Sequence, residues 1–205
     1  MGGWQLEGYG ELERERASGK REEVTGFALS RGMAEGLEVI VGAPWFRNGA
    51  DSIGDVTLDV KWRFLARGPF SFAFMPGVSL PTGDESELRG TGKLNWGGLL
   101  IASWEQGPLA VNAQAGYRRR DNEIGLKDSQ SELATAVLYR VAQVRWFGEA
   151  VFRSAPLVGG ESARYAALGA IWSVRRDFDL ALGWRSGHGG ALISDGWLFG
   201  ATVRW

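Results

Sequence analysis

The sequence predicts an all-β protein, a transmembrane antiparallel up-and-down β-barrel of about 12 strands that occupies residues 1–205 as a single domain. Three observations predict it. Strand-like segments alternate apolar with polar residues, the breaks between them are short and long by turns, and aromatic residues gather near the segment ends. A chain that crosses a membrane repeatedly, with tight turns on one side and longer loops on the other, is expected to have this pattern.

Short and long breaks follow one another along the whole chain. We assign the short ones to periplasmic turns; they lie at Arg31–Gly36, Leu65–Pro69, Glu105–Pro108, Val141–Gln143 and Val174–Asp177. We assign the long ones to outer loops; they lie at Ala17–Glu22, Phe46–Ile53, Pro81–Gly92, Arg119–Ser131, Arg153–Ser162 and Ser186–Asp195. Glycine and proline in the short breaks are typical of hairpin turns.

Alternation of residue types defines the strands, most clearly in Val56–Leu65. Its apolar residues alternate with Thr57, Asp59, Lys61 and Arg63. Because successive side chains of a strand point to opposite faces, this segment has one apolar and one polar face. In a membrane barrel the apolar face would contact lipid and the polar face would line the lumen. In a soluble sandwich or a lipocalin-like barrel, the alternative that this pattern leaves open, the apolar face would form the core.

Twelve segments are expected to form the wall. The first three are the less regular Trp4–Arg16, Glu23–Ser30 and Leu37–Trp45. The other nine are Val56–Leu65, Phe70–Leu80, Leu94–Trp104, Leu109–Tyr117, Leu133–Arg140, Val144–Arg153, Ala163–Ser173, Asp179–Arg185 and Trp197–Trp205. Pro76 removes one ladder hydrogen bond, so it is expected to mark a bulge or a strand end.

Composition excludes several classes of protein. With 44% hydrophobic residues, 31 glycines and 10 tryptophans, the chain is expected to fold. No run of about 18 apolar residues is present, which excludes a spanning helix. The chain has no cysteine, so it has no disulfide framework and no thiol chemistry. A net charge of −1 gives no basic stripe that would bind nucleic acid.

The chain starts with Met1-Gly2-Gly3-Trp4, which lacks the regions of a secretory signal. A bacterial outer-membrane location requires export, so we expect that a signal peptide has been replaced by a start codon. Aromatic side chains near strand ends are expected to lie at the two membrane interfaces. These are Trp45, Trp62, Phe64, Phe70, Trp104, Tyr117, Trp184 and Trp205.

The polar faces of the strands give the candidate pore-lining residues, which carry charges of both signs. They are Glu7, Glu11, Glu13, Asp59, Lys61, Arg63, Asn95, Asn112, Gln114, Arg118, Arg145, Glu149, Arg153, Asp179, Arg185 and Arg204. Such a set can form a charged constriction that selects solutes. It can equally pair internally and fill the interior. Twelve strands lie between barrels that side chains fill and barrels with wide channels, so a narrow or partly plugged lumen is expected.

Three segments in the middle of the chain resemble a known family. Gly54–Leu65, Pro76–Asp84 and Gly98–Tyr117 resemble, in this order, the MetA-pathway phenol-degradation family of outer-membrane proteins. The most distinctive match is Leu80-Pro81-Thr82-Gly83-Asp84. The resemblance implies an exported barrel that transports hydrophobic or aromatic compounds. It implies no particular binding residue.

Catalytic and cofactor chemistry has little support. The single histidine, His188, lies in a glycine-rich loop near Ser186 and Ser194, and no other catalytic motif accompanies it. The acidic clusters that begin at Asp84 and Asp121 lack the spacing of a known metal cage. We therefore expect no enzyme activity, no cofactor and no bound metal.

The function predicted first is a monomeric channel that passes small solutes passively, and the family resemblance implies that these are hydrophobic or aromatic. Its partners would be the lipid bilayer and the solute. An apolar solute would leave sideways through the wall, and Pro76 and the pair Gly97-Gly98 mark where a ladder would part. One alternative is a closed structural or docking barrel with a salt-bridged lumen. Another is a lipid-modifying enzyme that uses His188.

Overall fold

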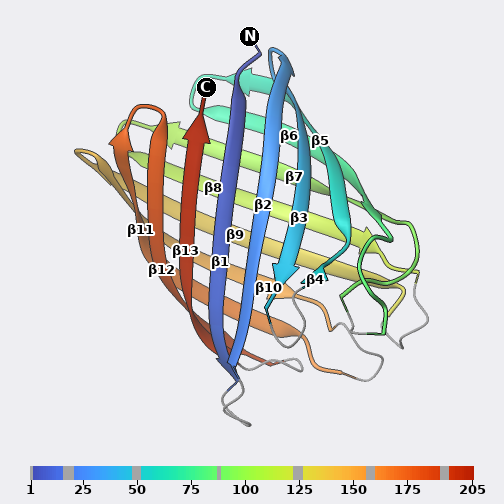
Figure 1. Cartoon of the computed structure of the whole chain (residues 1–205). Coiled ribbons are helices and arrows are strands. Elements are labelled where there is room, and N and C mark those ends of the chain that lie inside the picture. The colour runs from blue at the N-terminus through green and yellow to red at the C-terminus, as the bar shows by residue number, and fades with distance from the viewer. Residues whose placement is uncertain are drawn as a thin grey trace.

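Twelve long antiparallel strands close into a barrel in the computed structural model of the chain (Figure 1). The structure describes residues 2–15, 21–47, 52–86, 89–121, 127–155, 160–189 and 194–205. The closed barrel of twelve long strands confirms the predicted fold class and strand number. Within these ranges, no helix is long and apolar enough to cross a membrane.

Thirteen strands are present, and β4, with two residues, only extends the pairing of β3. They are β1 (Trp4–Glu15), β2 (Arg21–Ala34), β3 (Leu37–Phe46), β4 (Ser52–Ile53), β5 (Val56–Arg67), β6 (Phe70–Leu80), β7 (Asn95–Gln106), β8 (Leu109–Arg119), β9 (Ser129–Val141), β10 (Val144–Arg153), β11 (Ala163–Arg175), β12 (Phe178–His188) and β13 (Ser194–Arg204). Most are longer than predicted, because backbone pairing continues past the last regularly alternating residue.

The first and last wall strands join to close the barrel. β1 pairs with β13 from Gln5 opposite Arg204 to Glu15 opposite Ser194. Beyond this ladder, the Trp4 N–H donates to the Trp205 carbonyl at 2.8 Å and the Trp205 N–H donates to the Trp4 carbonyl at 3.0 Å. Both ends of the chain thus lie at the same rim as the short turns (Figure 1).

All five short breaks contain two-residue turns, Glu35–Gly36, Gly68–Pro69, Gly107–Pro108, Ala142–Gln143 and Arg176–Asp177. Gly68, Gly107 and Ala142 have positive φ at the first turn position, as a type II′ hairpin requires. The other two turns each lie beside a register shift, between Gly32 and Ala34 and between Ser173 and Arg175. The first break begins later than predicted, since β2 continues through its bulge to Ala34.

The two faces of the wall differ in the way that a membrane barrel requires. Large apolar side chains on the outer face are exposed, for example Leu168 at 71% and Trp62 at 54%. The buried polar residues of the wall, such as Ser79, Asn95 and Asp179, belong to the opposite set and point inward. The barrel thus has an apolar outside and a polar inside.

Pro76 lies in the middle of β6, so the expectation of a bulge or strand end at this residue is wrong. The β5–β6 ladder has partners at Asp59 and Gly77 and resumes at Trp62 and Phe74, so it is interrupted beside Pro76. The β6–β7 ladder continues without a shift past Gly97 and Gly98. The interruption therefore faces β5, because the missing N–H of proline affects the ladder on that side.

Candidate functional site: the inner wall of the barrel

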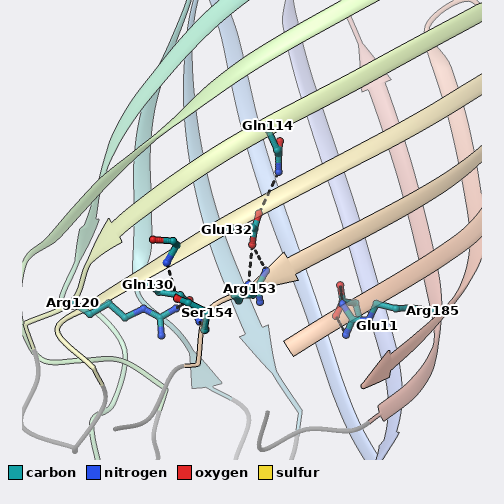
Figure 2. A network of polar contacts seen from close by, with 9 residues as sticks. Glu11, Gln114, Arg120, Gln130, Glu132, Arg153, Ser154 and Arg185 are labelled. Carbon is teal, nitrogen blue, oxygen red and sulfur yellow. Dashed lines mark hydrogen bonds and ion pairs between the residues drawn. The ribbon is translucent and has the colours of Figure 1, made fainter. Parts of the chain in front are cut away.

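Ion pairs connect one half of the inner wall. Arg153 on β10 donates to Glu132 Oε2 on β9 from Nε at 2.8 Å and from Nη2 at 2.6 Å (Figure 2). Gln114 on β8 donates to the other oxygen of Glu132 at 3.3 Å. Farther round, Arg185 on β12 pairs with Glu11 on β1 at 3.1 Å across β13.

Among the described acids of this half, Asp179 is the most buried, with 5% of its surface exposed. It accepts from Arg145 at 2.9 Å and from Arg204 at 3.0 Å. Arg204 also donates from Nε to Gln5 at 2.8 Å. We call this half, from β9 through β13 to β1, the paired wall; its ion pairs join Glu11, Glu132, Arg145, Arg153, Asp179, Arg185 and Arg204.

The four strands from β5 to β8 are different, and we call them the open wall. The side chains of Lys61, Arg63 and Arg118 make no hydrogen bond and no ion pair with any residue that the structure describes. Arg118 interacts at longer range with Asp59. A cation without a close partner keeps its hydrogen-bonding capacity for water or a solute.

Three cavities lie along the open wall. The upper cavity, of about 490 Å³, is at the long-loop end, and the middle cavity, of about 320 Å³, adjoins it. Both are lined by Thr57, Ser79, Asn95, Arg118 and Arg120. A third, of about 490 Å³, lies toward the short-turn rim and is lined by residues that include Lys61 and Arg63. The inside of the barrel is thus hollow along the open wall, where Lys61, Arg63 and Arg118 have no close partner among the described residues.

Arg120 follows the last residue of β8 and lines both the upper and the middle cavity. It donates to Gln130 at 2.5 Å (Figure 2). Burial, together with the nearby Arg118 and Arg153 cations, lowers the pKa of Arg120 to about 10. Arg118, Arg120 and Arg153 therefore lie close enough at this end of the lumen for their like charges to interact.

The loop between β6 and β7 is fastened over this region by Asp55. Its carboxylate accepts from the Gly83 N–H at 3.0 Å and from the N–H and hydroxyl of Thr91 at 3.1 and 3.2 Å. The Thr82 hydroxyl donates to the Gly54 carbonyl at 3.0 Å and accepts from the Val56 N–H at 2.8 Å. We call this set of contacts the loop clasp.

The loop clasp explains the most distinctive sequence segment. At Gly83 a Cβ would collide with the backbone of Arg89 and Gly90, so only glycine fits. Asn95 adds a second anchor, since its amide donates to the Lys93 carbonyl at 3.2 Å and its oxygen accepts from the Asp121 N–H at 2.7 Å. The clasp thus holds Gly90 and Thr91 against the upper cavity.

Two large aromatic side chains lie flat on the inner wall. The ring of Tyr9 occupies the space that a side chain at Gly26 would fill, and Tyr9 lines the upper cavity with 44% of its surface exposed. The ring of Phe147 covers Gly169 and Gly183 in the same way. Glycine on a neighbouring strand lets a ring lie along the wall, which leaves the centre of the lumen free.

The strand register places the predicted pore-lining residues as follows. The side chain of Glu13 lies outside the described residues, and all the others belong to the inward-facing set. Lys61, Arg63 and Asn112 line the short-turn cavity, while Asp59, Asn95, Arg118 and Arg153 line the middle one. Glu7 accepts from Gln5 at 2.6 Å. Glu149 makes no ion pair with a described residue.

The eight predicted interface aromatics all belong to the outward-facing set: Trp45, Trp62, Phe64, Phe70, Trp104, Tyr117, Trp184 and Trp205. Several form clusters, with ring centroids 5.8 Å apart for Trp62 and Phe64 and 6.1 Å apart for Trp96 and Tyr117. Trp184 meets Trp197 edge-on at 5.0 Å. Such clusters on a lipid-facing surface are typical of aromatic girdles.

Several inward-facing residues are not among the predicted pore-lining residues, namely Tyr9, Ser79, Arg120, Gln130, Glu132 and Phe147. Glu132 and Gln130 precede the predicted start of their strand, so the alternation was not extended to them. Tyr9 could have been found, because it occupies the polar register of β1 between Glu7 and Glu11.

Among the described residues, the structure does not bring together the side chains that were considered for catalysis or metal binding. Ser186 and His188 lie on the outer face at the end of β12, and the side chain of Ser194 lies outside the described residues. Glu87, Asn122 and Glu123 of the acidic clusters also lie outside them. Where residues are described, no group of three or more His, Asp or Glu side chains is placed to hold a metal.

Comparison with known proteins gives one family match. A family model described as "Putative MetA-pathway of phenol degradation" matches residues 18–191. A search of the curated proteins finds no match.

Solved structures with a similar fold are outer-membrane barrels. An outer membrane channel from Pseudomonas putida F1 has a TM-score of 0.76 and 12% identity, over 100% of this chain and 96% of that one. The NanC porin has a TM-score of 0.71 and 12% identity, over 97% and 98%. The KdgM porin in complex with disordered oligogalacturonate has a TM-score of 0.71 and 9% identity, over 97% and 98%. At these identities the likeness shows the fold alone.

Proposed function

From the premise that the chain belongs to the MetA-pathway phenol-degradation family, we propose that it is an outer-membrane channel for passive passage of small solutes. The observation that carries the proposal is the series of cavities along the open wall, from the loop clasp to the short-turn rim. A barrel of twelve strands is wide enough for such cavities and too narrow for a large pore.

The two walls would have separate tasks in such a channel. Paired charges on β9–β13 and β1 neutralise one another, so they hold the barrel wall without binding solute. Unpaired cations on β5 and β8 would replace part of the hydration of a passing solute. We propose that solute moves along the open wall in contact with Arg118 and then Lys61. The family description favours aromatic cargo, and the cations favour cargo that carries negative charge.

The location and assembly state belong to the same proposal. The apolar outer face and the aromatic clusters support insertion in the bacterial outer membrane, as the similar barrels do. One chain closes the sheet by itself through the β1–β13 pairing, so we propose a monomer.

A lateral exit is less well supported than an axial route. The interrupted β5–β6 ladder beside Pro76 is the place where a wall opening would form. A disulfide that locks β5 to β6 near Pro76 tests it, since a lateral route requires the lock to stop uptake of an aromatic substrate, while an axial route predicts unchanged uptake.

Planar-bilayer recording tests the channel itself. The protein refolded in detergent is inserted under a salt gradient, and single-channel current and reversal potential are measured. We expect discrete steps with a reversal potential that favours anions. Silence from folded protein would contradict the proposal and favour the closed structural barrel with its salt-bridged lumen.

A further inference from the structure

Tyr9 and Arg118 face the same cavity from opposite sides of the barrel. β1 and β8 are six strands apart in either direction around the ring, so their inner faces oppose each other across the lumen. The cavity of about 490 Å³ at the long-loop end is lined by both residues. Its volume falls within the range of about 300–1,000 Å³ that is typical of small-molecule sites.

The β1 side of this cavity offers an apolar surface. Tyr9 lies against Gly26, so its ring is held along the wall and one face remains accessible. An aromatic ring held in this way can stack on a flat apolar group. The lining next to Tyr9 comes from β3, where Gly42, Ala43, Pro44 and Phe46 add further apolar surface.

The β8 side offers hydrogen-bond donors and positive charge. Arg118 has no hydrogen-bond or ion-pair partner among the described residues, and neither does the hydroxyl of Ser79, which lines the same cavity. Arg118, Arg120 and Arg153 meet only two carboxylates, Asp59 and Glu132, in the adjoining cavity. Glu132 is already bonded twice by Arg153, so Asp59, which interacts with Arg118 only at longer range, is the carboxylate left beside Arg118.

We propose that this cavity binds a small organic anion with a flat apolar body, of which benzoate is the simplest example. The carboxylate is bound by Arg118 and Ser79, and the ring stacks on Tyr9. This assignment rests on the proposed channel function in so far as the site lies on the solute path. The opposed apolar and basic sides fix the orientation of the anion, because only one orientation brings its ring to Tyr9 and its charge to Arg118.

The test is a binding measurement that does not depend on conduction. The full chain is refolded in detergent, and the ¹⁹F line width of 4-fluorobenzoate is followed as the protein is added. Neutral 4-fluorobenzyl alcohol reports association with the micelle alone. We expect the anion to broaden strongly and saturably, and the alcohol to broaden only as it does in empty micelles.

Three variants assign the site. Arg118→Gln should weaken the apparent affinity about tenfold, since it removes a charged hydrogen bond. Tyr9→Leu should weaken it about threefold for 4-fluorobenzoate, which is the share expected from ring stacking. Arg119→Gln, one residue along but on the outer face, is the matched control and should leave the affinity unchanged. Circular dichroism checks that each variant is folded.

Each outcome separates this inference from the channel proposal. The site is overturned if native protein and folded Arg118→Gln broaden the 4-fluorobenzoate signal equally. It is also overturned if the anion and the alcohol are broadened equally, even when the barrel conducts potassium chloride. Binding with the expected variant pattern by a protein that is silent in bilayers supports the site and overturns the channel.

Discussion

The paired wall and the open wall of this barrel both carry charges inward, but the charges have different partners. Around Asp179 the arginines and acids of neighbouring strands bond to one another. Around Arg118 the nearest acid interacts only at longer range. The difference teaches that residue type alone does not give a lumen residue its role. A charge that is bonded to the wall contributes to the wall, and a charge that is not bonded is available to the solute.

The largest difference between the two walls is expected in the stability effect of a substitution at Asp179. Asp179→Ala leaves two arginines without their acid in a half-buried setting, so we expect a loss of about 3 kcal/mol in the free energy of unfolding. Urea titration in lipid vesicles measures it. Glu38→Ala removes an inward acid that has no ion-pair partner among the described residues, and it should cost less than about 0.5 kcal/mol. Glu38 lies on β3, outside both walls, so equal losses in the two variants would show that the ion pairs of Asp179 do not stabilise the paired wall.

The loop clasp gives the next largest effect. Asp55→Ala removes the acceptor for Gly83 and Thr91, so we expect a loss of about 1–2 kcal/mol and a higher single-channel conductance, because the loop is no longer held against the upper cavity. Unfolding and bilayer recordings measure the two quantities. Ser86→Ala, which breaks only the local contact to Asp84, is the control. A conductance equal to that of the native protein would show that the loop does not narrow the path.

Neutralising a cation on the open wall sharpens the comparison. Lys61→Gln should lower the chloride-to-potassium permeability ratio about twofold while the unfolding free energy stays within about 0.5 kcal/mol, since no bond is lost. Arg145→Gln, on the paired wall, should do the reverse and reduce stability with a smaller change in selectivity. Reversal potentials of both variants measure the selectivity, and urea titrations measure the unfolding free energy. If Arg145→Gln changed selectivity more than Lys61→Gln, the assignment of the two walls would be wrong.

The smallest effect is that of pH. Because the pKa of Arg120 is lowered to about 10, this residue loses its charge as the pH rises through that value. The anion preference of the channel should therefore decline in that range, and Arg120→Gln should show a smaller decline. Reversal potentials between pH 8 and pH 11 give the measurement. A native protein whose selectivity is constant over this range would place Arg120 away from the solute path.

The sequence could predict the strands and the inward-facing set because both depend on local alternation. Asp59, Lys61 and Arg63 point inward for the same reason that Leu58 and Val60 point outward. Partners could not be predicted. Whether Arg185 meets Glu11 depends on the registers of the β12–β13 and β13–β1 ladders and on the tilt that closes the ring, and local alternation specifies none of these.

Two further features depend on contacts that are distant in sequence. Pro76 is tolerated in mid-strand because β5 lacks a ladder partner beside it, which no local pattern reveals. The Leu80–Asp84 segment was distinctive in sequence, but its reason is the approach of Gly83 to Arg89 and Gly90 under the carboxylate of Asp55.

The rings that lie on glycines have a consequence for how such barrels diverge. The width of this lumen depends on glycines of the inner wall, which have no side chain. Tyr9 lies along the wall only while residue 26 is glycine, and Phe147 does so only while residues 169 and 183 are glycine. A single replacement at Gly26 would lift the tyrosine toward the axis and narrow the passage. Relatives with the same strand number can therefore acquire different size limits through one substitution, without rebuilding the barrel.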